Sequence, residues 1–248
     1  MASLGCDRIS VPVSRDDRII YYLHGGGFVM ALPNAQTAMI SRWCSVFEST
    51  AYMPDYRLAP EHPYPAAPDD CLAGYRWLLE DGASPSNIVM VGDSAGGCLS
   101  LVTLQRIQEE ELPMPACTVL LSPLADLTMS GETFISNERK DPMFTMQALL
   151  LMRNAYATEQ AVTEPAASPL FGEFTGLPPL KILVGGTEML LSDSLRVADR
   201  ARDSGVAVEL DIWPDMPHVF PAVLWLPESK AATNAIAEFV GKHTDWMK

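Results

Sequence analysis

A serine in a glycine-flanked turn is the clearest chemical signal in the sequence. The segment Gly92-Asp93-Ser94-Ala95-Gly96 directly follows the apolar run Ile88–Val91 and directly precedes an amphipathic segment. Small residues around a serine let the backbone turn sharply between a strand and a helix, so that the hydroxyl projects outward. We therefore predict that Ser94 is a nucleophile. The alternative is a helix start that binds phosphate, but the Lys-Ser/Thr ending of a P-loop and the G-x-G-x-x-G spacing are both missing.

Three consecutive glycines lie upstream, in His24-Gly25-Gly26-Gly27-Phe28, after the predicted strand Ile19–Leu23. Glycines leave backbone N–H groups unhindered, which suits an oxyanion hole whose other donor is the amide after the nucleophile, here Ala95. A glycine triplet alone is usually only a turn. Its pairing with the serine turn favours the oxyanion hole, and we expect His24 to brace the turn rather than act as a base.

A nucleophilic serine needs a base, and the base needs an acid to orient it. In folds with such a serine turn, the acid follows the serine along the chain and the histidine comes last. His218 follows the predicted strand Val208–Trp213 and is the predicted base. His62 precedes the serine in a proline-rich turn, and His243 lies near the C-terminus, where a surface role is expected.

Two carboxylates compete for the role of the acid. Glu188 follows the predicted strand Lys181–Val184, at the carboxyl edge of the sheet, where sites on such sheets gather. Asp193 begins the predicted helix Asp193–Ser204, so it also fits a cap or a first-turn acid. We favour Glu188 and keep Asp193 as the alternative.

The rest of the chain alternates short apolar runs with longer amphipathic ones. This pattern predicts an α/β fold, a mostly parallel sheet with helices on both faces. The predicted strands are Ile19–Leu23, Ile88–Val91, Cys117–Leu121, Lys181–Val184 and Val208–Trp213. Predicted helices follow Pro68, Ala95, Asp193 and Pro227.

The alternation breaks between Ala125 and Pro179. This segment is rich in Met, Leu and Phe and contains one helix-like run, Thr145–Ala157, but no obvious strand. We interpret residues 125–179 as a cap or lid insertion within a single domain that spans residues 1–248.

Composition limits the partners. The 248 residues carry a net charge of −14, and 48% of them are hydrophobic, which excludes a disordered chain. Because so acidic a surface repels phosphates, we do not expect nucleic acid as a partner. The longest run without charged residues, Ile19–Ser41, contains His, Pro and three glycines, so no membrane span is expected.

The cysteines indicate a reducing compartment, and the histidines give no indication of a catalytic metal. The five cysteines are widely spaced, odd in number and without a C-x-x-C pair, which argues against disulfides and a zinc site. The four histidines lie far apart in the sequence, which leaves a catalytic metal without ligands. The N-terminus lacks the pattern of a secretory signal. We therefore expect a cytoplasmic protein with no metal and no cofactor.

Several segments form a specific combination: His24-Gly25-Gly26-Gly27-Phe28, Asp55-Tyr56-Arg57-Leu58-Ala59-Pro60-Glu61-His62-Pro63, Gly92-Asp93-Ser94-Ala95-Gly96-Gly97, Ser122-Pro123 with Asp126, and Met216-Pro217-His218-Val219-Phe220. Together they resemble the hormone-sensitive-lipase-like branch of the α/β-hydrolase family, the bacterial family IV carboxylesterases. The resemblance covers nearly the whole chain. It implies an α/β-hydrolase fold and cofactor-free hydrolysis of short-chain carboxylic esters, and many such relatives are homodimers. Position by position, Ser94 matches the nucleophile, His218 the base, and Gly26, Gly27 and Ala95 the oxyanion donors.

The sequence departs from the family pattern at two places. Most relatives have Asp where this chain has Glu188, although one extra methylene still lets a carboxylate reach an imidazole. Relatives also carry a helical cap segment ahead of the strand that leads into the glycine triplet. Only 23 residues precede His24 here, so we expect a reduced cap.

Residues next to the motifs are the candidates for an acyl pocket, with ordinary core positions as the alternative. They are Phe28, Met30, Leu190, Val219 and Phe220. Lactone and amide hydrolysis share the acyl-enzyme route and stay open as activities. Two non-enzymatic alternatives also stay open. One is a non-catalytic ligand-binding protein on the same fold, which the presence of His218 disfavours. The other is an inactive product with an exposed apolar face.

Overall fold

One twisted sheet organises the computed structural model, which describes residues 5–246. Within that range seven strands have the order β1-β3-β2-β4-β5-β6-β7. Only β1 runs antiparallel to its neighbour, so the predicted α/β class with a mostly parallel sheet is confirmed. The strands are β1 (Cys6–Ile9), β2 (Arg15–Leu23), β3 (Ser49–Pro54), β4 (Ile88–Asp93), β5 (Cys117–Leu121), β6 (Leu180–Gly185) and β7 (Val208–Trp213).

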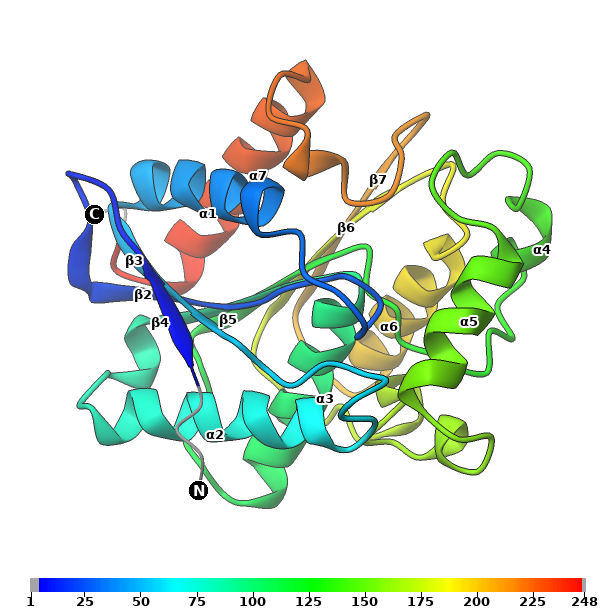
Figure 1. Cartoon of the computed structure of the whole chain (residues 1–248). Coiled ribbons are helices and arrows are strands. Elements are labelled where there is room, and N and C mark those ends of the chain that lie inside the picture. The colour runs from blue at the N-terminus through cyan, green and yellow to red at the C-terminus, as the bar shows by residue number, and fades with distance from the viewer. Residues whose placement is uncertain (1–4, 247–248) are drawn as a thin grey trace.

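Helices cover both faces of this sheet (Figure 1). The helices α1 (Pro33–Phe47) and α7 (Pro227–His243) pack on one face, and α2 (Ala66–Glu80), α3 (Ala95–Glu109) and α6 (Leu191–Asp203) pack on the other. Alternate residues of the central strands serve the two faces. In β2, Tyr21 belongs to the α2/α3/α6 core, whereas Tyr22 belongs to the α1/α7 core. A sheet buried on both faces explains why its central strands read as continuous apolar runs.

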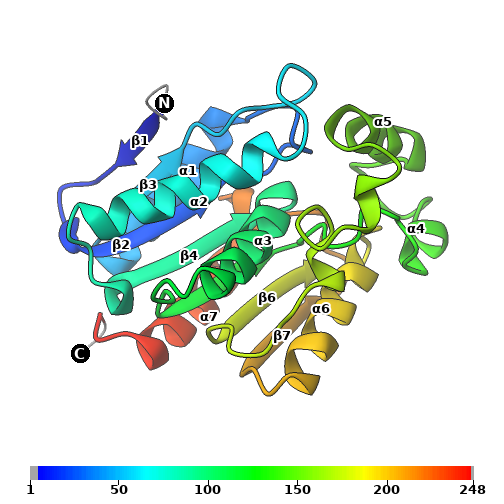
Figure 2. The same ribbon diagram turned by 90° about the horizontal axis from the view of Figure 1, so that it is seen from below.

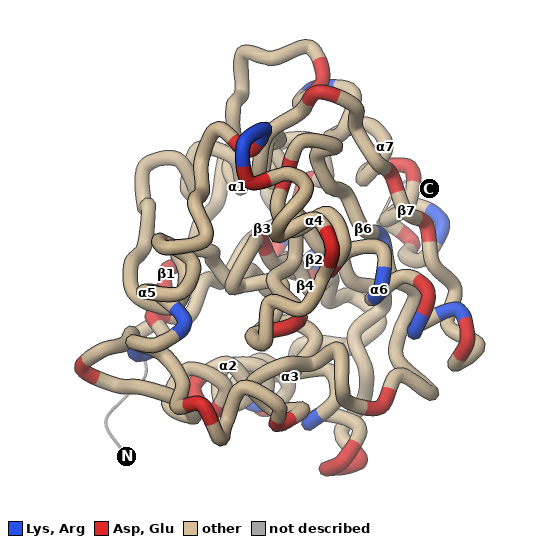
Figure 3. Tube along the Cα trace, turned by 90° about the vertical axis from the view of Figure 1, so that its right-hand side faces the viewer, with Lys and Arg blue, Asp and Glu red and all other residues tan. Residues whose placement is uncertain are grey.

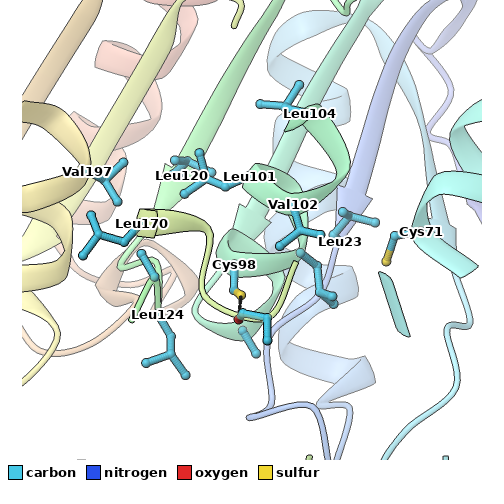
Figure 4. Close-up of a cluster of buried hydrophobic side chains, with 14 of the residues drawn as sticks. Leu23, Cys71, Cys98, Leu101, Val102, Leu104, Leu120, Leu124, Leu170 and Val197 are labelled. Atoms are coloured by element: carbon cyan, nitrogen blue, oxygen red, sulfur yellow. Dashed lines mark hydrogen bonds between the residues drawn. The ribbon is translucent and has the colours of Figure 1, made fainter. Parts of the chain in front are cut away.

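Helix α3 carries much of the core beneath the serine turn. Cys98, Leu101 and Val102 of α3 belong to one buried cluster that also contains Leu23 of β2, Leu120 of β5 and, from the segment after β5, Leu170 (Figure 4). The Cys98 thiol donates a hydrogen bond to the carbonyl of Ala167, with sulfur and oxygen 3.4 Å apart. The base of the serine turn is therefore fixed by dense packing. All five cysteines are free thiols, and only Cys6 is exposed.

Residues between β5 and β6 form a separate helical segment. It contains α4 (Thr133–Ser136), α5 (Met146–Tyr156) and the short 3-10 helices Ala161–Thr163 and Pro169–Phe171, with no strand. Figure 2 shows α4 and α5 standing to one side of the sheet, past the ends of β4 and β6. Two further 3-10 turns span Pro85–Asn87 and Phe220–Ala222.

Four elements were not predicted, namely β1, β3, α1 and the short helix α4. The strand β3 begins Ser-Thr-Ala, and β1 has three exposed residues out of four, so neither shows an apolar alternation. Helix α1 has no capping side chain at its first boundary, Leu32, and lies partly in the charge-free run. Two predicted helix starts were also late, since α2 begins at Ala66 and α6 at Leu191. Local signals mark such elements weakly because tertiary pairing and burial stabilise them.

The charged residues lie mostly on the outer helices and turns of the trace (Figure 3). This distribution matches a sequence with 31 acidic and 17 basic side chains. Across residues 5–246, no helix combines the length and the apolar character needed to cross a membrane.

Candidate functional site

Ser94 occupies a strained turn between β4 and α3. Its backbone has φ of 55° and ψ of −118°, a conformation that L-residues rarely adopt. The turn is held because the Ser94 amide donates to the Leu121 carbonyl at 2.8 Å. Gly96 is required for the same geometry, since a Cβ there would lie 1.9 Å from the Leu23 carbonyl oxygen. Helix α3 can therefore approach β2 closely only with glycine at this position.

Asp93 joins the serine turn to the glycine loop. The carboxylate is buried, and its Oδ1 accepts the Tyr22 hydroxyl at 2.6 Å and the Gly25 amide at 2.8 Å. Burial raises the pKa of Asp93, and these two donors act in the opposite direction. A Cβ on Gly25 would lie 2.2 Å from Asp93 Oδ2, so the two segments are in direct contact.

The glycine loop presents unpaired amides beside the serine turn. Gly26 has φ of 125° and Gly27 has φ of 63°, so both occupy conformations that favour glycine. In the part of the chain that the structure describes, the amides of Gly26, Gly27 and Ala95 donate to no protein acceptor. Free N–H groups at a helix start and an adjacent loop suit a site where negative charge develops.

Glu188 and His218 form a buried pair. Oε2 of Glu188 lies 2.8 Å from Nδ1 of His218, and the two side chains are 0% and 4% exposed. The other oxygen, Oε1, accepts the Ser122 hydroxyl at 2.7 Å and the Gly185 amide at 2.5 Å. Ser122 Oγ in turn accepts the Val219 amide at 3.2 Å. From the sequence, Ser122 is part of a family motif with no predicted contact to the acid.

Asp193 lies away from the histidine. Its Oδ2 accepts the amides of Ala125 and Asp126 at 2.8 and 3.0 Å, which ties α6 to the start of the helical insertion. Its Oδ1 has no hydrogen-bond partner among residues 5–246. Burial raises the pKa of Asp193 to about 7. The structure thus places Glu188, and not Asp193, against His218.

Ser94 and His218 line the same pocket, although they are far apart in the sequence. No hydrogen bond joins the Ser94 hydroxyl to the imidazole within the described residues. Phe144 of the helical insertion packs edge-on against the His218 ring, with centroids 4.9 Å apart.

The pocket around Ser94 is a small, mainly apolar cavity of about 310 Å³. Four methionines contribute to its wall, two from the segment before and within α1 and two from the helical insertion. These are Met30, Met39, Met143 and Met152. Two of the five candidate pocket residues, Met30 and Val219, lie on this wall.

The structure places the other three candidates elsewhere. Phe28 is buried and stacks on Tyr156, with ring centroids 3.8 Å apart. Leu190 is buried in the α2/α3/α6 core, and Phe220 packs against Trp213 on the opposite side of the sheet. Each neighbours a site residue in the chain, but its side chain points into the core. The residues contributed by α1, namely Ala35, Gln36 and Met39, went unrecognised because α1 itself was not predicted.

The remaining histidines have other surroundings. His24 stacks on Tyr56 with centroids 4.2 Å apart, and its Nδ1 lies 2.7 Å from the Gly25 carbonyl. Burial lowers the pKa of His24, which favours the neutral ring. His62 is exposed, and His243 packs beside Phe239.

Known proteins share this architecture. A family model of the alpha/beta hydrolase fold matches residues 20–222. The chain is 34% identical to an acetyl-hydrolase of Streptomyces hygroscopicus, over 92% of this chain and 77% of that protein. It is 35% identical to an esterase of Acinetobacter venetianus, over 90% of this chain and 74% of that protein.

A solved structure agrees with these relatives. The crystal structure of an esterase from the bacterial hormone-sensitive lipase family superposes with a TM-score of 0.91 at 38% identity, over 98% of this chain and 86% of that one. The chain therefore belongs to the α/β-hydrolase fold family, in its bacterial hormone-sensitive-lipase branch.

Proposed function

We propose that this chain is a serine carboxylesterase that hydrolyses short-chain carboxylic esters through an acyl-enzyme intermediate. The observation that carries the proposal is the buried Glu188 carboxylate on Nδ1 of His218, beside a pocket that Ser94 also lines. The relatives named esterase and acetyl-hydrolase support the same reaction class. The proposed reaction uses no metal and no cofactor.

Glu188 determines which tautomer the His218 imidazole adopts. Because its carboxylate accepts a hydrogen bond from Nδ1–H, the lone pair of His218 remains on Nε2. Nε2 then takes the Ser94 proton as the hydroxyl oxygen attacks the ester carbonyl. The imidazolium that forms is stabilised by the carboxylate and protonates the leaving alcohol. Water, activated by the same nitrogen, releases the carboxylic acid in the second step.

The amides of Gly26, Gly27 and Ala95 are the proposed oxyanion donors. The carbonyl oxygen gains negative charge only as the tetrahedral intermediate forms, so donors at that position accelerate the chemical step. Removing one such donor typically costs about 3–4 kcal/mol of transition-state stabilisation.

The cavity and the helical insertion define the proposed substrate range. A volume of about 310 Å³ with a mostly apolar wall fits a short acyl chain. Residues 125–179 are proposed to act as a cap on a single domain, since Met143, Phe144 and Met152 contribute to the wall above Ser94. Five free cysteines support a cytoplasmic location. A homodimer stays a prediction, which light scattering on the purified protein tests.

The function is tested with Ser94→Ala and a series of p-nitrophenyl esters from acetate to laurate. We expect turnover to fall by at least about 10⁴-fold in Ser94→Ala. An organophosphonate with a fluoride leaving group should phosphonylate the wild type, with release of fluoride and a mass gain equal to the phosphonyl group, and should leave Ser94→Ala unmodified. Ser86→Ala, at an exposed position in a 3-10 turn, is the matched control and should behave as the wild type. Unchanged turnover in Ser94→Ala would exclude the proposed mechanism.

A further inference from the structure

The direction of the Gly26 amide depends on the carbonyl of Gly25, because both belong to one planar peptide group. In a trans peptide the N–H and the C=O point in opposite directions. A group that holds the Gly25 carbonyl therefore also determines where the Gly26 N–H points. Two side chains lie at this carbonyl: His24 Nδ1 at 2.7 Å and Gln36 Nε2 at 3.1 Å.

Gln36 reaches the glycine loop from α1, on the same wall of the pocket. Its side chain is buried, and its two ends have different partners. Oε1 accepts the Leu32 amide at 2.8 Å, which leaves Nε2 for the Gly25 carbonyl. A rotated amide would place two donors together at Leu32 and two acceptors together at Gly25. The hydrogen bonds therefore permit one orientation only.

The neighbouring amide of Gly27 is held differently. It shares a peptide group with the Gly26 carbonyl, which accepts the amides of Val29 and Met30 at 3.2 and 3.1 Å. Main-chain groups thus fix the direction of the Gly27 N–H. Only the Gly26 N–H depends on side chains, and one of them comes from a helix outside the motifs that carry the chemistry.

We propose that Gln36 is a positioning residue of the esterase reaction, which holds the Gly25–Gly26 peptide with the Gly26 N–H directed into the oxyanion hole. The inference rests on the proposed function. Gln36 touches the Gly25 carbonyl and not the reacting atoms, so its effect passes through the Gly26 amide. An oxyanion donor acts mainly in the transition state, so its loss lowers kcat rather than raising KM.

The first test compares Gln36→Leu with Gln105→Leu. Gln105 is a matched control, because it is also buried and its Nε2 donates to a main-chain carbonyl, that of Pro169, at 2.9 Å, but it does not line the pocket. For Gln36→Leu we expect kcat to fall at least about tenfold with KM within about twofold, because misdirecting one donor forfeits part of its contribution. A trifluoromethyl ketone, which mimics the tetrahedral intermediate, should bind more weakly, so that its inhibition constant rises by the same factor as kcat falls. Gln105→Leu should leave both quantities unchanged.

The second test uses Gln36→Glu and its control Gln105→Glu. An ionised carboxylate has no proton to donate to the Gly25 carbonyl, whereas a protonated carboxyl has one. The ratio of variant kcat to wild-type kcat should therefore rise as the pH falls toward the ionisation range of the introduced carboxyl. The same ratio should stay flat for Gln105→Glu. A role limited to stabilising α1 would not produce this recovery.

Each outcome decides a separate question. A wild-type kcat in folded Gln36→Leu, verified by circular dichroism, would overturn the proposal. If Gln36→Leu does not fold, a pH-independent ratio for Gln36→Glu overturns it instead. Absence of ester turnover in the wild type would contradict the proposed function itself, so the two failures are distinguishable.

Discussion

Ser122 links Glu188 to the segment that carries His218. Its hydroxyl donates to Glu188 Oε1 at 2.7 Å and accepts the amide of Val219, the residue after His218, at 3.2 Å. The carboxylate is therefore held from one side while its second oxygen faces the imidazole at 2.8 Å. These contacts hold the Glu188 side chain in the rotamer that faces His218.

Glu188→Gln should lower kcat by roughly 10⁴-fold, the effect seen when the orienting acid of a serine triad is replaced by its amide. The amide can donate to Nδ1, which favours the imidazole tautomer with its proton on Nε2, and that tautomer cannot accept the serine proton. Steady-state kinetics on p-nitrophenyl butyrate measure the effect. Asp193→Asn serves as the control and should retain most of the turnover. Loss of turnover in Asp193→Asn, with turnover retained in Glu188→Gln, would assign the role of the acid to Asp193.

Asp193 should make stability depend on pH. Burial raises the pKa of this carboxyl from 3.8 to about 7 in the folded chain, so the folded state keeps a proton that the unfolded state has released. The free energy of unfolding should fall as the pH rises between about 4 and about 7, by on the order of 1 kcal/mol per pH unit from this group.

Urea unfolding at several pH values tests this expectation with Asp193→Asn. The variant should gain stability over the wild type at pH 8 but not at pH 4, because it has no charge to bury. Parallel curves for the two proteins across this range would refute the assignment.

Gly27 and Met152 should be energetically coupled. A Cβ on Gly27 would lie 2.4 Å from the Met152 sulfur, and the residue has φ of 63°. Gly27→Ala should lower kcat, because the loop must shift to relieve this contact and the left-handed conformation costs roughly 1–2 kcal/mol with a Cβ. Since the obstacle is a flexible side chain, Met152→Ala should recover part of the loss. A double-mutant cycle measures the coupling, and strictly additive effects would show that the contact is unimportant.

Met39 should limit the length of the acyl chain. It is fully buried in α1 and contributes to the wall of the cavity. Met39→Ala removes side-chain volume, so the kcat/KM optimum in the p-nitrophenyl series should move toward longer acyl groups. Met53→Ala, a buried methionine in β3 away from the cavity, should lower stability by roughly 2–5 kcal/mol without moving the optimum. An unchanged optimum in Met39→Ala would place the acyl chain elsewhere.

Sequence patterns identified the central strands because burial on both faces demands continuous apolar runs, as in β4 and β5. The serine turn was equally clear, since its backbone needs glycine at Gly96 and tolerates few alternatives. Helix α1 and strand β3 were not predicted. Because α1 was not predicted, its pocket residues Gln36 and Met39 were not recognised either. Phe28, Leu190 and Phe220 show that adjacency to a motif does not reveal which way a side chain points.

The amino-acid sequence by itself determined the α/β class and the sharp turn at Ser94, because the first depends on local periodicity and the second on residues that a local conformation requires. Only the tertiary structure decided which carboxylate meets His218 and which side chain holds the Gly25 carbonyl. Glu188 reaches His218 from the turn after β6, and Gln36 reaches the Gly25 carbonyl from α1. Such distances depend on how strands and helices pack together, and no local pattern encodes them.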